Sequence, residues 1–472
     1  MNRDPDQRDI DLLRHVYAGD LVGGMNRSRP AVALHLLEDH PDLASGDPYV
    51  ACAFGDEARL REATARDPSW LHRDGGPLRL LPLVAVTHSG LLKLPAWRER
   101  LHACARFLLS AGASPNQSVI SRWGREGGEG LDASETDSDE AHPLSALYGA
   151  AGQHHDSELT ALLLAAGADP NDGESLYHSL ESVACTRLLL EAGARVSGTN
   201  AMYRVLDLDA IEALRLLLAF GGDPNEAPLG APTSDWGSPL LWAIRRRRST
   251  AHIAALLEAG ADPHARTRDG TSAFLMASRL GLIDVAELLR AAGAGSEPMS
   301  DVDTFVAACA AGNEAGARTV LSRHPGLIDG LDERQRRWLP ELAAEGCDQA
   351  VWLMVELGWP IETRGGDWSA TALNMAVFRG DAALTRFLLE HGADWRTEHG
   401  FGDNAMGTLS WASLNEPVAD GDWVGCAQAL MAHGIPDARP HPDDAELVLM
   451  GDHVSQFSDE VTEALLAGRS AV

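Results

Sequence analysis

Residues 371–395 read TALNMAVFRGDAALTRFLLEHGADW and contain the pattern that decides the fold. Leu373 and Ala376 lie at the three-residue spacing of one helix face, and Thr371 can cap the start of that helix. Gly and Asp at 380–381 end the first helix and begin a second, since Gly forms left-handed C-caps and Asp forms N-caps. The Leu-rich run that follows ends at another Gly, so the segment predicts a pair of helices.

The end of this segment recurs along the chain in the form Leu-Leu-x-x-Gly-(Ala/Gly)-x-Pro-Asn. The clearest copies are LLSAGASPN around Gly112, LLAAGADPN around Gly167 and LLAFGGDPN around Gly221, and others centre on Gly193, Gly260, Gly293, Gly358, Gly392 and Gly434. Gly260 and Gly293 are 33 residues apart, and Gly358 and Gly392 are 34 residues apart. One helix pair cannot bury both of its apolar faces alone, so the pairs must stack on their neighbours.

A second phrase, Ser/Thr-x-Leu followed by Ala, stands upstream of several copies. It reads SPLLWA at Ser238, TALNMA at Thr371 and TLSWA at Thr408. Together the two phrases resemble the ankyrin-repeat family, whose 33-residue unit contains T-P-L-H-x-A. The resemblance covers most of residues 46–437, although no copy has the full TPLH and two units differ in length, so the repeat borders stay open. It implies an all-α, ankyrin-type helical-hairpin solenoid of about twelve repeats in two consecutive arrays, with short finger turns.

The polar stretches predict how the chain is divided. We expect N-terminal capping helices in 1–45, a larger array in 46–296, a linker in 297–302, a second array in 303–437 and a C-terminal cap in 438–472. Residues 117–141 are rich in Gly, Ser and acidic residues, which favours a mobile acidic insertion over a functional loop. The G-x-G-x-x-A phrase at Gly128 lies in this insertion and no strand precedes it, so it does not predict a dinucleotide site.

The charge balance limits the classes of partner. The 472 residues include 69 acidic and 39 basic side chains, a formal net charge of -30. Such a chain repels phosphate backbones and anionic lipid, so we expect no nucleic-acid or membrane partner and favour a basic protein. The six cysteines are scattered without a CxxC pair, and only one basic residue is a lysine. These features predict reduced, mostly buried thiols in a cytoplasmic protein of bacterial origin.

The tryptophans are the strongest indication of a binding surface, because seven of the twelve fall between Trp338 and Trp423. Aligned to the repeat, Trp368 and Trp395 fall in finger turns, and Trp411 and Trp242 fall in first helices beside the inward Ala. The resemblance implies that fingers and first helices contact partners, and exposed Trp and Arg are frequent hot spots. Packing of the same indoles between repeats is the alternative, and both remain open. The partner-binding candidates are Trp368, Trp395, His399, Phe401, Asp403, Asn404, Trp411, Phe378, Arg379, Trp242, Arg245 and Arg246.

Two of these groups come from short segments. The loop 396–407, RTEHGFGDNAMG, predicts an ordered, extended finger whose polar and aromatic residues either contact a partner or are structural. The basic run at 245–248 ends a first helix, where it is either solvated or contacts an anion or acidic partner.

No motif predicts chemistry. P-loop, HExxH and GxSxG strings are absent from the sequence, and we expect no catalytic residue, cofactor or metal. His154, His155 and Asp156 could supply metal ligands, as could His35 and His40, but a solvated turn is the favoured interpretation. The sequence therefore predicts a non-catalytic protein-recognition scaffold. An immunity or antitoxin-like inhibitor of a basic bacterial effector is the alternative and an enzyme is a weaker one, while the oligomeric state stays open.

Overall fold

The computed structural model describes residues 5–24, 27–40, 43, 46–122, 143–227, 237–295, 298–442, 444 and 447–468. The chain divides into two compact units. The first unit is Met1–Leu229 with Glu258–Ala261, and the second unit is Gly230–Leu257 with Asp262–Val472.

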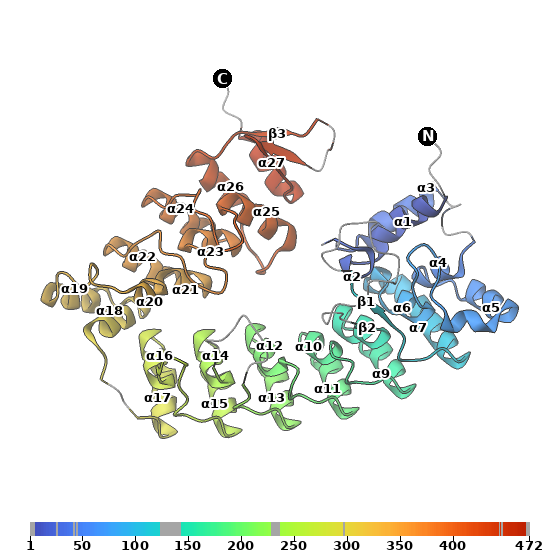
Figure 1. The fold of residues 1–472 in the computed structure, drawn as a ribbon, viewed down its shortest axis with the longest axis horizontal. Coiled ribbons are helices and arrows are strands. Elements are labelled where there is room, and N and C mark those ends of the chain that lie inside the picture. The colour runs from blue at the N-terminus through green and yellow to red at the C-terminus, as the bar shows by residue number, and fades with distance from the viewer. Residues whose placement is uncertain are drawn as a thin grey trace. The chain divides into compact units, whose positions relative to one another are not determined.

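The first unit is a stack of helix pairs (Figure 1). Its helices are α1 (Pro5–Val16), α2 (Gly19–Val22), α3 (Pro30–Asp39), α4 (Pro48–Ala53), α5 (Glu57–Arg66), α6 (Pro82–Thr87), α7 (Pro95–Ser110), α8 (Ala146–Tyr148), α9 (Ser157–Ala165), α10 (Ser175–Ser179), α11 (Val183–Glu191), α12 (Ala201–Asp207) and α13 (Ile211–Ala219), with short turns η1 (Pro68–His72), η2 (Gly90–Lys93) and η3 (Gly149–Gln153). The first helices α4, α6, α8, α10 and α12 contact one another in sequence, and the second helices α5, α7, α9, α11 and α13 do the same.

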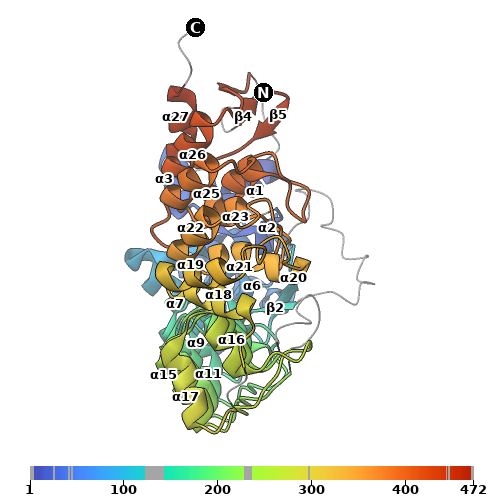
Figure 2. The ribbon, with the colours of Figure 1, turned by 90° about the vertical axis from the view of Figure 1, so that its left-hand side faces the viewer.

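The second unit repeats this arrangement. Its helices are α14 (Pro239–Arg245), α15 (Thr250–Glu258), α16 (Ala273–Arg279), α17 (Ile283–Ala291), α18 (Asp301–Ala310), α19 (Glu314–Arg323), α20 (Glu333–Arg336), α21 (Trp338–Ala344), α22 (Asp348–Glu356), α23 (Ala372–Phe378), α24 (Ala382–Glu390), α25 (Ala405–Asn415), α26 (Trp423–Ala432) and α27 (Asp459–Ala467). Helices α21, α23 and α25 stack in order, as do α22, α24, α26 and the terminal α27 (Figures 1 and 2). The two stacks confirm the predicted solenoid of helical hairpins.

The pair α23/α24 shows why residues 371–395 fold in this way. Thr371 Oγ1 accepts from the Asn374 amide at 3.2 Å, while Asn374 Oδ1 accepts from the Thr371 amide at 3.2 Å, so the two side chains form a capping box. Asp381 caps α24 by accepting from the Leu384 amide at 2.8 Å. Between them Gly380 has a φ of 66°, and a Cβ there would lie 2.7 Å from the Cα of Gly421. Glycine is required at this turn for its conformation and for the approach of the next repeat.

The Asn of the repeated Pro-Asn phrase joins neighbouring repeats. Asn171 Nδ2 donates to the carbonyl oxygen of Gly193 at 3.2 Å, and its Oδ1 accepts from the Arg195 amide at 2.9 Å. We call this arrangement the inter-repeat bond. Asn116 donates in the same way to Gly167 (3.3 Å) and Asn225 to Gly260 (2.9 Å), and in the second unit Glu362 accepts from the Asp394 amide (2.8 Å). Each such side chain lies four residues after the Gly that ends its own second helix. The fixed spacing of the motif therefore places a polar side chain where it can bond to the next repeat.

The start of the predicted mobile insertion is ordered. Gln117 is buried, donates to the Leu71 carbonyl at 2.6 Å and accepts from the Leu83 amide at 2.8 Å. Strand β1 (Ser118–Ile120) then pairs antiparallel with β2 (Pro143–Ser145). The prediction of mobility was therefore wrong for 117–122. Residues 123–141, including the phrase at Gly128, lie outside the described residues.

Two other expectations also differ from the structure. Helix α16 contacts α18 across the predicted 297–302 linker, and both belong to the second unit, so the border between the compact units lies elsewhere. The C-terminal cap contains the expected helix α27. It also contains an antiparallel sheet in the order β3 (Ala438–Pro440), β4 (Val448–Met450) and β5 (His453–Ser455), which the all-α prediction did not include.

The cysteines follow the sequence prediction. All six are free thiols, five of them buried and Cys347 half-buried. Within the described residues, no helix combines the length and apolar character needed to cross a membrane.

The first unit also buries two imidazoles. Burial, with a smaller contribution from the neighbouring His154, lowers the pKa of His88 to about 3. His88 Nδ1 lies 3.1 Å from the Val84 carbonyl oxygen, so in the neutral ring this nitrogen carries the proton. The pKa of His154 falls to about 4, again mainly through burial. Both rings are therefore neutral in the folded state near pH 7.

These depressed pKa values predict that acid weakens the first unit. Below pH 6.5 the unfolded chain protonates both imidazoles while the folded chain does not, so stability is present above that pH and is lost as the pH falls. Well below pH 6.5, each ring lowers the free energy of unfolding by up to about 1.4 kcal/mol per pH unit. Urea denaturation at pH 7, 6 and 5 should show a shallower pH dependence for His88→Gln than for wild type. The exposed-site variant His264→Gln should keep the wild-type slope, and an unchanged slope in His88→Gln would contradict the assignment.

The inter-repeat bond predicts a second stability effect. Asn171→Ala removes a donor and an acceptor that join two repeats, so it should lower the free energy of unfolding by about 1–2 kcal/mol in urea denaturation. Asn171→Asp keeps the acceptor for the Arg195 amide and loses only the donor, so its loss should be smaller. Equal stability of Asn171→Ala and wild type would show that the bond contributes nothing.

Candidate functional site

Five aromatic side chains of the second unit form a continuous row, which we call the aromatic ladder. In order they are Phe401, His399, Trp368, Phe378 and Trp411, with successive ring centroids 6.0, 4.9, 5.6 and 5.5 Å apart. They come from two neighbouring repeats, because one ring precedes α23, one ends α23, two lie in the finger before α25 and one lies in α25. All five are residues that the sequence predicted as partner-binding candidates, and the fold brings them together.

The two ends of the ladder face solvent. The exposed fraction is 82% for Phe401 and 42% for Trp411, whereas Trp368 and Phe378 are half-buried and His399 is buried. The last contact of the row is a stack, with an angle of 9° between the planes of Phe378 and Trp411. Exposed rings that rest on buried neighbours are held in place without a partner, so little side-chain entropy is lost when something binds them.

The finger that carries two of these rings is fixed by backbone bonds. The Gly400 amide donates to the Trp368 carbonyl at 2.8 Å, and a Cβ on Gly400 would lie 2.7 Å from that oxygen. The His399 amide donates to the Asp403 carbonyl at 2.7 Å, which closes the turn. The predicted ordered finger is therefore present at 396–404, anchored to the preceding finger, whereas 405–407 form the start of α25.

The imidazole in the ladder is uncharged near pH 7. Burial lowers the pKa of His399, while the charge of Asp403 raises it and that of Arg364 lowers it. The Phe401 amide donates to His399 Nδ1 at 3.2 Å, so the proton of the neutral ring lies on Nε2. The ladder therefore presents an aromatic surface, and the exposed carboxylates of Glu398 and Asp403 lie close enough to act on the His399 ring.

Four other predicted residues lie near the ladder, and three of them have structural roles. Trp395 is 8% exposed and belongs to the core of the second unit, so its prediction as a contact residue was wrong. Asn404 caps α25 by accepting from the Met406 amide at 2.9 Å. Arg379 is half-buried and contacts the Ala343 carbonyl and Asp348, each at 3.3 Å, which holds α23 against the preceding repeat. Of the four, only Asp403 keeps an exposed side chain.

The candidates on α14 are also engaged within the second unit. Trp242 is fully buried, so it is not a contact residue, and core packing is the interpretation that the structure supports. Arg245 pairs with Asp367 at 3.3 Å, and Arg246 pairs with Glu345 at 2.8 Å. The sequence left solvation or contact with an acidic partner open for this basic run, and the structure instead pairs these two arginines with acidic groups of their own unit.

A cavity of about 440 Å³ lies beside these ion pairs. Its lining includes Arg245, Thr271, Arg279, Arg334, Arg337, Trp338 and Glu341. Burial raises the pKa of Glu341, while Arg245 lowers it. The other charges are paired, Arg279 with Asp303 at 2.6 Å and Arg337 with Glu333 at 2.6 Å. Sequence reasoning missed this cavity, because its walls come from segments more than 60 residues apart.

The metal ligands considered from the sequence do not converge. His155 Nε2 lies 3.0 Å from the His178 carbonyl, whereas Asp156 contacts His102 at 2.8 Å. His35 and His40 are exposed. Within the part of the chain that the structure describes, neither set forms a group of ligand atoms.

Stacked antiparallel helix pairs, a 33-residue spacing and finger turns joined by inter-repeat bonds are all present. The fold is of the ankyrin-repeat type. No model of a known protein family matches the sequence, and no curated protein matches it.

Two solved ankyrin-repeat structures are similar to parts of the chain. The human ASB11 ankyrin repeat domain is 21% identical, covers 50% of this chain and 98% of its own, and has a TM-score of 0.24. The ankyrin repeat domain of Bcl-3, described as a unique member of the IkappaB protein family, is 22% identical, covers 53% of this chain and 88% of its own, and has a TM-score of 0.28.

The positions of two tryptophans in the second unit predict losses of stability of different size. Trp395→Ala opens a cavity in the core and should lower the free energy of unfolding by about 3–5 kcal/mol. Trp411→Ala removes a half-exposed ring and one stacking contact, so it should cost about 1 kcal/mol. Urea denaturation followed by circular dichroism measures both. Equal losses would contradict the division between core and ladder.

Proposed function

We propose that this protein is a non-catalytic recognition scaffold that binds a protein partner through the aromatic ladder. The single observation behind the proposal is the row of five contacting rings with solvent-exposed ends at Phe401 and Trp411. Large aromatic side chains held in place before binding are the usual centres of binding energy in protein interfaces. The stack of repeats keeps the ladder in one conformation. Binding at the rings therefore loses little conformational entropy, because no loop has to be ordered.

We further propose that the protein is cytoplasmic and that its partner is basic. The net charge of -30 attracts a cationic protein over distances of about a Debye length and repels nucleic acid and anionic lipid. Close to the ladder, the exposed carboxylates of Glu398 and Asp403 can pair with Arg or Lys of the partner. A guanidinium lying over the face of Trp411 or Phe401 would add a cation–π contact.

The contact set is smaller than the sequence predicted. The proposed set is Trp368, Phe378, His399, Phe401, Asp403 and Trp411. Trp242, Trp395, Arg245, Arg246, Arg379 and Asn404 support the fold around it, as their burial or internal bonds indicate.

Inhibition of a basic bacterial effector, as an immunity or antitoxin-like protein, is a narrower form of this proposal. It depends on the same net charge of -30 and on a bacterial origin. Co-expression with a neighbouring toxin gene should then rescue growth, and the Trp411→Ala variant should rescue it poorly.

The proposed interface predicts which exposed apolar side chains matter. Phe401→Ala and Trp411→Ala should each weaken partner binding by about 30-fold or more, the effect of losing a hot-spot residue. The measurement is affinity capture from the native host at low and high salt, with mass spectrometry, followed by titration of the recovered partner. A basic partner should be captured less efficiently at high salt.

The matched control is Ile283→Ala, which removes an exposed apolar side chain (63% exposed) on α17. It should bind the partner as wild type does. Capture of the same partners by wild type and Trp411→Ala at equal affinity would remove the ladder from the interface. Recovery of no specific partner at any salt concentration would argue against the scaffold function itself.

A further inference from the structure

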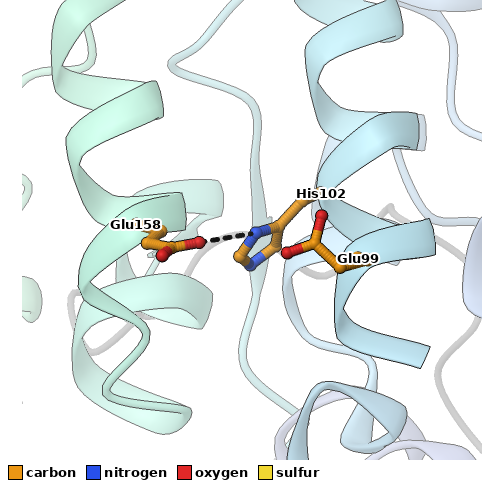
Figure 3. A group of neighbouring side chains, drawn as sticks. All are labelled: Glu99, His102 and Glu158. Atoms are coloured by element: carbon orange, nitrogen blue, oxygen red, sulfur yellow. Dashed lines mark ion pairs between the residues drawn. The ribbon is translucent and has the colours of Figure 1, made fainter. Parts of the chain in front are cut away.

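A second cluster of side chains lies in the first unit, away from the ladder residues in sequence. Glu99 and His102 are three residues apart on α7, so they share one helix face, and Glu158 lies in the first turn of α9. One possible ligand atom from each residue lies within 4.8 Å of the others. Figure 3 shows the Glu158 carboxylate pointing from α9 toward the imidazole, with the Glu99 carboxylate beside the same ring.

The imidazole is the rigid member of the cluster. The side chain of His102 is 2% exposed, whereas those of Glu99 and Glu158 are 75% and 78% exposed. His102 Nε2 lies 2.8 Å from Asp156 Oδ2, and Asp156 Oδ1 accepts from the Leu159 amide at 3.0 Å. Because Asp156 is itself fixed as the N-cap of α9, it holds the ring in one orientation.

The other ring nitrogen faces a carboxylate without a hydrogen bond. A carboxylate accepts, so the proton between Asp156 and His102 lies on Nε2, and in the neutral ring Nδ1 has a lone pair. This nitrogen lies 3.6 Å from Glu158 Oε2, beyond hydrogen-bond distance. A cation between the Nδ1 lone pair of the neutral ring and the Glu158 carboxylate would be bound by both groups.

We propose that Glu99, His102 and Glu158 bind a divalent transition-metal ion, with Zn²⁺ as the cation that suits these donors. Imidazole nitrogen and carboxylate oxygen are ordinary zinc ligands, whereas Mg²⁺ and Ca²⁺ take oxygen ligands only. A histidine ligand that donates its second N–H to a carboxylate is the usual arrangement behind bound zinc, and Asp156 supplies that carboxylate.

Binding requires only small movements. Ligand atoms around a tetrahedral Zn²⁺ lie about 3.3 Å apart, so the two exposed glutamates must move inward by roughly 1–1.5 Å toward the fixed ring. Two cations lie near the carboxylates, Arg98 at 3.6 Å from Asp156 and Arg106 at 3.9 Å from Glu99. Arg106 is about half exposed and can turn away, while Arg98 offsets part of the Asp156 charge.

The ion would act as a link between repeats. Helices α7 and α9 are neighbouring second helices of the first unit and contact each other directly. Ligands from both would tie the two repeats together, so bound metal stabilises the folded state in proportion to the logarithm of its concentration above the dissociation constant. The two glutamates line an open hollow together with Pro95, Arg98, His155 and Ser157, which gives the ion a path from solvent to their carboxylates.

The test is isothermal titration of ZnCl₂ into the full-length, metal-free protein. Wild type should bind one Zn²⁺ more tightly than any background site, and the double variant Glu99→Gln/Glu158→Gln should lose that one equivalent. Asp156→Asn keeps the helix cap and removes the charge behind the ring, so it should weaken the site by about 10–100-fold. X-ray absorption of the one-equivalent complex should show a single imidazole among oxygen ligands.

Glu191→Gln is the matched control, since it removes an exposed carboxylate from the neighbouring second helix α11. It should bind Zn²⁺ as wild type does. The two ligand glutamates are exposed, so the double variant should stay folded by circular dichroism, and its loss of binding then reports the site. The proposal is overturned if wild type and the double variant bind the same number of Zn²⁺ ions. It is also overturned if His102→Gln binds Zn²⁺ with wild-type affinity.

Discussion

The left-handed backbone of the glycine that ends most of the second helices is the constraint on which the arrays depend. Nine glycines at this position have φ values between 81° and 103°: Gly112, Gly167, Gly193, Gly221, Gly260, Gly293, Gly358, Gly392 and Gly434. A Cβ at any of them would meet no atom within 4 Å, so space is not the reason for glycine. The reason is conformation, because residues with a side chain rarely adopt this φ. The turn sends the chain outward as a finger and back into the next repeat.

Both surfaces with a proposed role follow from this turn. The finger places a side chain four residues after the glycine, where it bonds to the next repeat and sets the distance between fingers. In the second unit the same spacing brings the finger that carries His399 against the one that carries Trp368, and the ladder begins there. In the first unit the stacking of second helices brings α9 beside α7 and so brings Glu158 to His102.

The sequence predicted those features of the structure that are determined by residues close together along the chain. Helix pairs, caps and the ladder residues Trp368 and Trp411 follow from position within a repeat. Trp242 and Trp395 occupy equivalent positions, yet both are buried, because exposure depends on what the adjacent repeat places against the ring. Glu99 and His102, three residues apart on one helix, were detectable as a pair, but nothing local connects them with Glu158.

The ladder has a consequence for the cooperativity of the array. In a stack where each repeat contacts only its neighbours, the terminal repeats open most easily. The ladder crosses from the repeat α23/α24 to the repeat α25/α26. A protein bound along it would therefore contact both repeats and stabilise the interface between them. Partner binding would then raise the free energy needed to unfold the repeats at this end of the chain. By the same linkage, a change that destabilises the junction would also lower the affinity for the partner.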